Sequence, residues 1–172
     1  MDQINWCNVE HFFYATMLKV GYPSEHPTLT DGGNGFRLIT HASDDLYFED
    51  RWTRTPESNK SSGTTTIFMR FPQKDNNRPT SYVPIWAMHY GGWYTRGAAL
   101  FLKEILRTSY ETSMVEFRGC RGPFSQRKET GALYTNTLHP LSSFTGFRGE
   151  ECIVSNLGLL SGEHIYFGHA LI

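Results

Sequence analysis

The feature that most restricts the fold is a series of short segments that alternate apolar and polar residues or are rich in β-branched and aromatic residues. Both patterns are typical of β-strands. They occur in residues 36–43, 45–52, 64–71, 82–90, 113–119, 131–136, 142–155 and 163–172. Only residues 9–20 and 98–106 place apolar side chains at helical spacing, with Asn8 expected to cap the first helix.

These patterns predict an α+β protein. We expect a single globular domain over residues 1–172, built on a bent, mostly antiparallel sheet of about eight short strands with two main helices. The polar segments between the strands, such as residues 54–63 and 72–80, are predicted to be loops and turns.

Composition and charge argue against several classes of partner. A net charge of -1 provides no basic surplus for a phosphate backbone, so direct binding of nucleic acid is not expected. No apolar run reaches the roughly 18 residues of a membrane span, and the N-terminus lacks the features of a signal peptide. The cysteines Cys7, Cys120 and Cys152 are odd in number and widely separated, which predicts a reducing cytoplasm and no disulfide framework.

The strand predicted at residues 82–90 carries the densest group of aromatic side chains. Trp86, Met88 and Tyr90 are expected on one face, and the opposite face is also largely apolar, which predicts a central strand covered on both sides. We expect Gly91 to end the strand. His89 lies on the second face, where it is either a satisfied core residue or an acid, base or ligand-binding group.

Two arginines follow the second predicted helix. Arg118 and Arg121 flank a glycine before a Gly-Pro turn, an arrangement that fits a clamp for a carboxylate or a phosphate. The alternative is that both arginines lie on the surface and pair with Glu116 or Glu129.

Carboxylates are the other candidates for chemistry. Asp50 shares a strand face with Phe48 and Trp52 and is expected to be buried with a partner, for which Arg118 is a natural choice. Residues 150–151 add two glutamates. The seven histidines show no pairing that suggests a metal site, and no nucleophile motif is present, so neither a metal nor a cofactor is predicted.

A series of motifs resembles an uncharacterised bacterial domain family that often lies C-terminal to an XRE-type helix-turn-helix in transcriptional regulators. The motifs, in order, are FFYATMLKVGYPS, GGNGFRLIT, DDLYFEDRW, VPIWAMHYGG, AALFLKEIL, FRGCRGPF, FTGFRGEECI and IYFGHALI. The positions that the resemblance singles out are Tyr47, Asp50, Trp86, Met88, Tyr90, Gly91, Arg118, Gly122, Pro123, Gly146, Glu150 and Tyr166.

The resemblance implies sensing or partner binding, here by a stand-alone version without the DNA-binding module. The chain departs from the family pattern at His89, where an amide side chain is expected, and in the ending GHALI. No reaction is implied, because the family's activity is undetermined.

Three functional hypotheses follow. The first is a cytoplasmic ligand-sensing or interaction domain for a small polar or anionic molecule. Its candidate ligand-binding residues are Tyr47, Trp86, His89, Tyr90, Arg118, Arg121, Glu150 and Tyr166. The second is a small hydrolase or transferase in which Glu150 or Asp50 is the general base and His89 an acid or a proton shuttle. The third is a structural homodimer. A pocket that joins His89, Arg118 and Glu150 would favour a ligand or chemistry.

Overall fold

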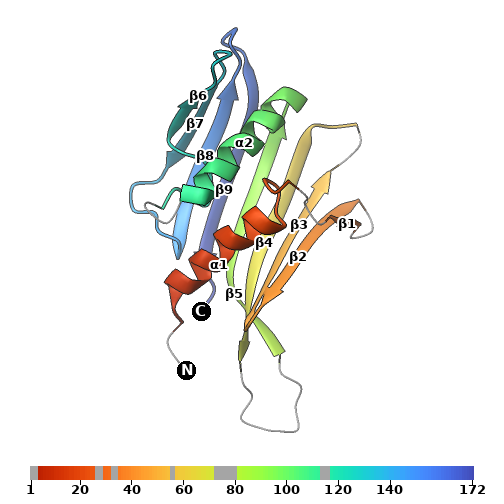
Figure 1. Cartoon of the computed structure of the whole chain (residues 1–172), viewed down its shortest axis with the longest axis vertical. Coiled ribbons are helices and arrows are strands. Elements are labelled where there is room, and N and C mark those ends of the chain that lie inside the picture. Colours follow the sequence, from red (N-terminus) through yellow and green to blue (C-terminus); the bar gives the residue numbers. More distant parts are fainter. Residues whose placement is uncertain (1–3, 26–28, 32–34, 55–56, 72–80, 113–116) are drawn as a thin grey trace.

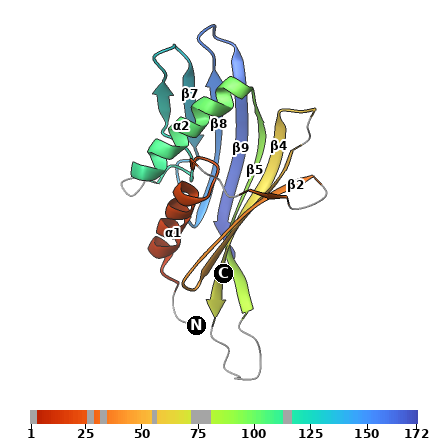
Figure 2. The ribbon, with the colours of Figure 1, turned by 45° about the vertical axis from the view of Figure 1, so that its right-hand side comes forward.

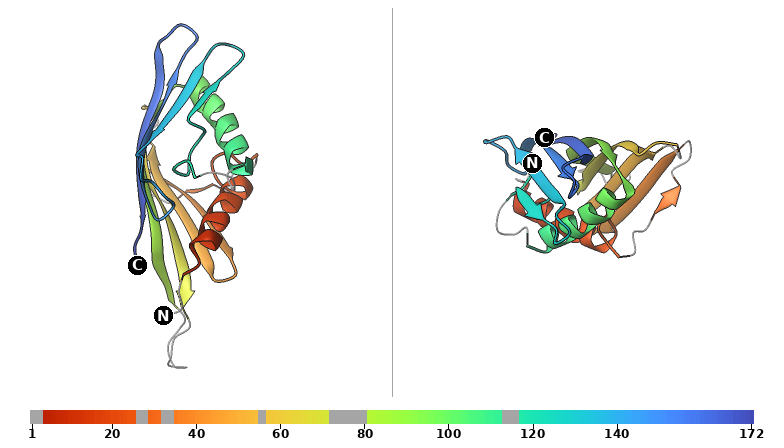
Figure 3. Two further views of the ribbon diagram at one scale, coloured as in Figure 1. Left: turned by 90° about the vertical axis from the view of Figure 1, so that its left-hand side faces the viewer. Right: turned by 90° about the horizontal axis from the view of Figure 1, so that it is seen from above.

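Two helices cover one face of a nine-stranded antiparallel sheet in the computed structural model (Figure 1). The structure describes residues 4–25, 29–31, 35–54, 57–71, 81–112 and 117–172. The sheet bends around the helices, as the two views in Figure 3 show. We call the helix-covered, concave face the inner face and the opposite one the outer face. The predicted mixture of helices with a bent antiparallel sheet is confirmed, with nine strands instead of about eight.

The helices are α1 (Trp6–Lys19) and α2 (Arg96–Thr112). The strands are β1 (Thr30–Asp31), β2 (Phe36–Ser43), β3 (Leu46–Arg54), β4 (Lys60–Phe71), β5 (Ser81–Tyr94), β6 (Ser125–Arg127), β7 (Leu133–Leu138), β8 (Gly146–Val154) and β9 (Leu160–Ala170). Their order across the sheet is β1-β2-β3-β4-β5-β9-β8-β7-β6. The chain therefore builds one half of the sheet from its edge to β5, passes through α2, and builds the other half from the opposite edge inwards to β9.

Both helices lie along the inner face (Figure 2). In α2 the predicted apolar stripe is confirmed, because Ala98, Phe101, Leu102, Ile105 and Leu106 are all buried. The first helix begins at Trp6, three residues before its predicted start. The Asn5 side chain, not that of Asn8, caps it by accepting a hydrogen bond from the Asn8 backbone N–H at 3.3 Å.

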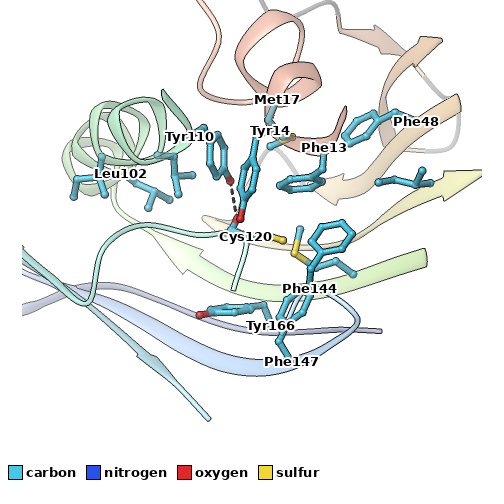
Figure 4. Packing of buried hydrophobic residues seen from close by; sticks show 14 of the residues in the cluster. Phe13, Tyr14, Met17, Phe48, Leu102, Tyr110, Cys120, Phe144, Phe147 and Tyr166 are labelled. Atoms are coloured by element: carbon cyan, nitrogen blue, oxygen red, sulfur yellow. Dashed lines mark hydrogen bonds between the residues drawn. The ribbon is translucent and has the colours of Figure 1, made fainter. Parts of the chain in front are cut away.

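The hydrophobic core lies between the helices and the inner face (Figure 4). Phe13 of α1 is fully buried, and its ring centroid lies 5.5 Å from that of Trp86 and 6.3 Å from that of Phe48. Trp86 stacks on Phe144 at 4.8 Å and donates its Nε1–H to the Phe144 carbonyl at 2.7 Å. Its indole is thus satisfied within the core.

The central strand differs from its prediction in two ways. β5 lies in the middle of the sheet as expected, but it runs on through Gly91 and Gly92 to Tyr94 instead of ending at the glycines. Both glycines pair in the ladder, Gly92 with His164. In addition, helices cover only the inner face of the strand, so His89 on the outer face is only half-buried. On the same face Ala87 is buried, so the prediction that both faces are covered is confirmed only in part.

Other observed strand boundaries also differ from the predicted ones. β4 begins at Lys60, inside the predicted loop, while β1 and β6 were not predicted. Of the strand predicted at residues 113–119, positions 113–116 lie outside the described residues and Phe117 and Arg118 are not in a strand. The register of β4 against β5 shifts opposite Pro84, in agreement with the expected effect of a proline in a strand. Neither described helix is long and apolar enough to cross a membrane.

Candidate functional site

A cavity of about 620 Å³ lies between α2 and the inner face of the sheet. Its volume is typical of small-molecule sites. Its apolar wall contains Met17, Trp52, Met88, Leu102 and Leu106. Its polar side contains Asp50, Thr65, Tyr90, Tyr94, Arg121 and His164. The cavity thus joins residues from four strands, both helices and the segment that follows α2.

Arg121 and Glu151 form a buried ion pair on the polar side. The Arg121 side chain is 8% exposed and Glu151 is fully buried on β8. Glu151 also accepts hydrogen bonds from the hydroxyls of Tyr94 at 2.5 Å and Tyr134 at 2.6 Å. Burial alone would raise the pKa of Glu151, but the Arg121 charge and these hydrogen bonds outweigh it and hold the pKa below its ordinary value. The pair therefore stays ionised, and its two charges compensate one another.

Asp50 is a second buried carboxylate, and it titrates close to neutral pH. Its Oδ1 accepts hydrogen bonds from Tyr90 Oη at 2.8 Å and from Thr65 Oγ1 at 2.9 Å. Burial raises the pKa of Asp50 to about 6, although the two hydrogen bonds and the Arg121 charge oppose the rise. The group can therefore gain or lose a proton under physiological conditions.

His164 is the least satisfied side chain of the site. It is 6% exposed, and neither ring nitrogen has a hydrogen-bond partner among the described residues. Its ring centroid lies 4.7 Å from that of Tyr94 and 6.0 Å from that of Tyr90. Burial and the Arg121 charge lower the pKa of His164 to about 4, with partial compensation by Glu151. The imidazole is therefore neutral at pH 7, and its 4.0 Å approach to Glu151 is not an ion pair.

Glycines on the inner face explain why these rings lie flat against the sheet. Five aromatic side chains each lie over the glycine that pairs with them on the neighbouring strand. The pairs are Gly63 with Tyr90, Gly92 with His164, Gly149 with Tyr166, Gly162 with Tyr94, and Gly168 with Phe147. A Cβ atom at Gly92 would lie 2.2 Å from His164 Cδ2, so any other residue would displace the ring. Rings that lie along the sheet leave room beneath α2.

The arrangement provides binding chemistry more clearly than catalytic chemistry. The Nε–H of Arg121 is also buried without a partner among the described residues, and Arg121 and His164 both line the cavity, so a donor and a neutral imidazole without hydrogen bonds lie at its polar side. Within the described part of the chain, no group of three or more His, Cys, Asp and Glu side chains is arranged to hold a metal ion.

Three of the sequence candidates line this cavity: Tyr90, Arg121 and Asp50. The expected pairing of Asp50 with Arg118 is not observed, because Asp50 accepts from Tyr90 and Thr65. The surface alternative for Arg121 was wrong, because this arginine is buried against Glu151. The Arg118 guanidinium instead lies 5.9 Å from the centre of the Phe124 ring.

The remaining candidates lie elsewhere. Trp86 and Tyr166 are core residues, and the Tyr166 hydroxyl donates to Asn136 Oδ1. Tyr47 packs its ring against Phe68 and Tyr82, each at 5.7 Å between centroids. These three side chains are not part of the inner cavity.

His89 lines a groove on the outer face. Its Nδ1 lies 3.1 Å from Thr64 Oγ1, and its ring stacks on Phe167 with 5.0 Å between centroids. The groove has a volume of about 770 Å³, and neither Arg118 nor Glu150 lines it. Glu150 is exposed on β8. The structure therefore does not bring the expected trio of His89, Arg118 and Glu150 into one pocket.

Sequence reasoning missed His164 and Glu151, although a signal for both was present. Alternation along β8 places Glu151 on the same face as Phe147 and Ile153, and alternation along β9 places His164 with Tyr166. All five side chains are buried. The motif resemblance favoured Glu150, whereas the strand period favours its neighbour.

Comparison with protein-family models, curated proteins and solved structures finds no match to this chain. The resemblance to a regulator-associated domain family therefore stays a prediction. The case for function accordingly depends on the geometry of the inner cavity.

Proposed function

We propose that the protein is a ligand-sensing domain that binds a small molecule in the inner cavity, between α2 and β3, β4, β5 and β9. The observation that carries the proposal is the buried His164 imidazole, which lines this cavity with both ring nitrogens unpartnered among the described residues. Buried polar side chains are nearly always hydrogen-bonded, so such a group in a cavity of ligand size suggests that a partner is provided on binding.

The energetic cost of these unpartnered groups supports this reading. An unsatisfied buried polar group costs about 1–3 kcal/mol, and both His164 and the Arg121 Nε–H are of this kind. A protein without a use for the cavity would gain stability from an apolar residue at position 164. A ligand that bonds these groups would recover part of this free energy.

The walls of the cavity favour a role in sensing. Met17 of α1 and Leu102 and Leu106 of α2 line it from the helices, while Asp50, Tyr90 and His164 line it from the sheet. A ligand that touches both sides would change the free energy of holding the helices against the sheet, which is what a regulatory domain requires.

A hydrolase or transferase is the second candidate, and Asp50 is the residue that favours it. A carboxylic acid with a pKa of about 6 that lines a cavity is suited to general acid–base catalysis. In this arrangement Asp50 would take the role of the base, with the Tyr90 hydroxyl at 2.8 Å as its neighbour. His89 lies in the outer groove and would not take part.

A thermal-shift screen of cellular metabolites tests the proposal. The control is Ala99→Phe, which adds bulk to the cavity wall at a half-buried position of α2. We expect at least one metabolite to raise the Tm of the wild type and not that of the variant. Recovery of that metabolite unchanged after prolonged incubation supports sensing, whereas conversion supports catalysis. If every stabilising compound acts equally on both proteins, the inner cavity is not the binding site.

A further inference from the structure

We propose that the ligand of the inner cavity presents an uncharged polar edge, with a hydrogen-bond acceptor beside a donor, on a flat apolar body. Amides, lactams and nitrogen heterocycles of the nucleobase type have such an edge. This inference rests on the proposed function and specifies the chemical class of the ligand.

The need for an acceptor follows from Arg121. Its guanidinium is already bound to Glu151, so the charge is compensated, but its Nε–H remains buried and without a partner in the described part of the chain. Only an acceptor can satisfy this group, because an arginine side chain has no acceptor of its own. A ligand with donors alone, such as an ammonium group, would leave the Nε–H unpaired beside a positive charge.

The need for a donor follows from His164 and Asp50. The neutral imidazole has one nitrogen with a lone pair, which requires a donor, and one N–H. Asp50 accepts at Oδ1 from Tyr90 and Thr65 and lines the same cavity. A carboxylate ligand would offer acceptors alone and would face the negative charge that Asp50 carries above its pKa of about 6. Of the polar or anionic ligands expected from the sequence, an anionic one is therefore a poor match for the polar side.

The flat apolar body follows from the space between the helices and the aromatic rings that lie along the sheet. Met17 and Met88 contribute flexible thioethers, while Leu102, Leu106 and Trp52 complete an apolar surface. The other basic side chains that line the cavity lie towards its rim, where Arg96 is exposed and Lys103 is half-buried. Rim charges are screened by solvent, so they contribute little selectivity for the part of the ligand that is buried.

A matched series of three probes tests the inference. Naphthamide, naphthoate and naphthylmethylamine share one flat body and differ only in a head that is a neutral donor and acceptor, an anion or a cation. We expect naphthamide to bind the full chain roughly tenfold to a hundredfold more tightly than either charged probe, because each charged head leaves a buried group unsatisfied. Isothermal titration calorimetry at pH 7.5 measures the three Kd values.

Two variants locate the binding. His164→Phe keeps a ring over Gly92 and removes both nitrogens, so the Kd of naphthamide should rise about tenfold. His89→Phe, the matched change in the outer groove, should leave the Kd unchanged. The ¹⁵N shifts of the His164 ring in the wild type report contact directly, so the test does not depend on the folding of the variant.

The outcomes separate this inference from the proposed function. Tighter binding of naphthoate or naphthylmethylamine, with perturbed His164 shifts, would overturn the ligand class and leave the inner cavity as a binding site. Probes that bind without perturbing His164, or that fail to bind while the metabolite screen also yields nothing specific to this cavity, would overturn both. Selective binding of naphthamide that His164→Phe weakens and His89→Phe does not would support both.

Discussion

Replacing Asp50 by asparagine should change the free energy of unfolding in a pH-dependent way. The variant's free energy of unfolding, minus that of the wild type, should be more favourable at alkaline pH than at acidic pH. The amide oxygen of the introduced side chain can still accept from Tyr90 and Thr65, so the substitution mainly removes a charge. Because burial raises the pKa of Asp50 from 3.8 to about 6, the folded protein holds this proton more tightly than the unfolded chain. The wild type therefore loses stability as the pH rises from below 3.8 through 6.

The pKa difference gives the magnitude. One pH unit corresponds to about 1.4 kcal/mol, so ionisation of Asp50 costs the wild type about 3 kcal/mol of unfolding free energy at pH 8 and about half as much at pH 5. The hydrogen-bond energy lost with the carboxylate is about the same at both pH values, so it cancels when the difference at pH 8 is compared with that at pH 5. The unfolding free energy of Asp50→Asn minus that of the wild type should therefore be about 1.4 kcal/mol more favourable at pH 8 than at pH 5.

His164 makes the comparison with the wild type necessary. The pKa of this histidine is lowered to about 4, so its contribution to stability is present above pH 6.5 and is lost as the pH falls towards 4. This change opposes that of Asp50 in the wild type, and it cancels in the difference between the two proteins. Arg121, Tyr90 and Thr65, which also surround Asp50, are unchanged in the variant.

Urea unfolding followed by circular dichroism at pH 5 and pH 8 measures the difference. Glu150→Gln is the matched control, because it removes an exposed carboxylate from the outer face of the sheet. An Asp50→Asn variant that is destabilised equally at both pH values would refute the reasoning, since Asp50 would then titrate alike in the folded and unfolded states.

Three further substitutions test the packing in and near the site. Glu151→Gln should lower the free energy of unfolding by about 3–5 kcal/mol in urea titrations, because it leaves the Arg121 charge buried without a partner; a loss as small as that of Glu150→Gln would show that Glu151 is not paired. Gly92→Ala should lower the Tm and shift the His164 ring signals, because its Cβ would lie 2.0 Å from the Glu163 carbonyl oxygen. Gly97→Ala in α2 should stabilise the protein by about 0.5–1 kcal/mol, because an added Cβ atom would meet no described residue outside its own helix turn within 4 Å, and equal effects of the two alanines would contradict the packing described.

The sequence predicted most of the fold because its signals are local. The spacing from Ala98 to Leu106 and the alternation around Phe48 and Asp50 report directly on the face that is buried. The end of β5 was placed wrongly because a Gly-Gly pair in isolation indicates a turn. Its role depends on the His164 ring, which comes from β9, close to the end of the chain.

The site was harder to predict because it depends on contacts between distant segments. Asp50 was correctly expected to be buried, but its partners Thr65 and Tyr90 come from two other strands. Nothing local to Arg118 and Arg121 indicates which arginine turns inwards. Arg121 turns inwards because it pairs with Glu151, and the burial of Glu151 follows from the alternation of β8.

A crystallographic fragment screen tests the central claim most directly. Crystals soaked with uncharged amide and lactam fragments should show bound molecules between α2 and the inner face, with polar atoms within hydrogen-bond distance of His164 or of Arg121 Nε. Fragments that gather only in the outer groove around His89, or an inner cavity that stays free of fragments in every soak, would contradict the account.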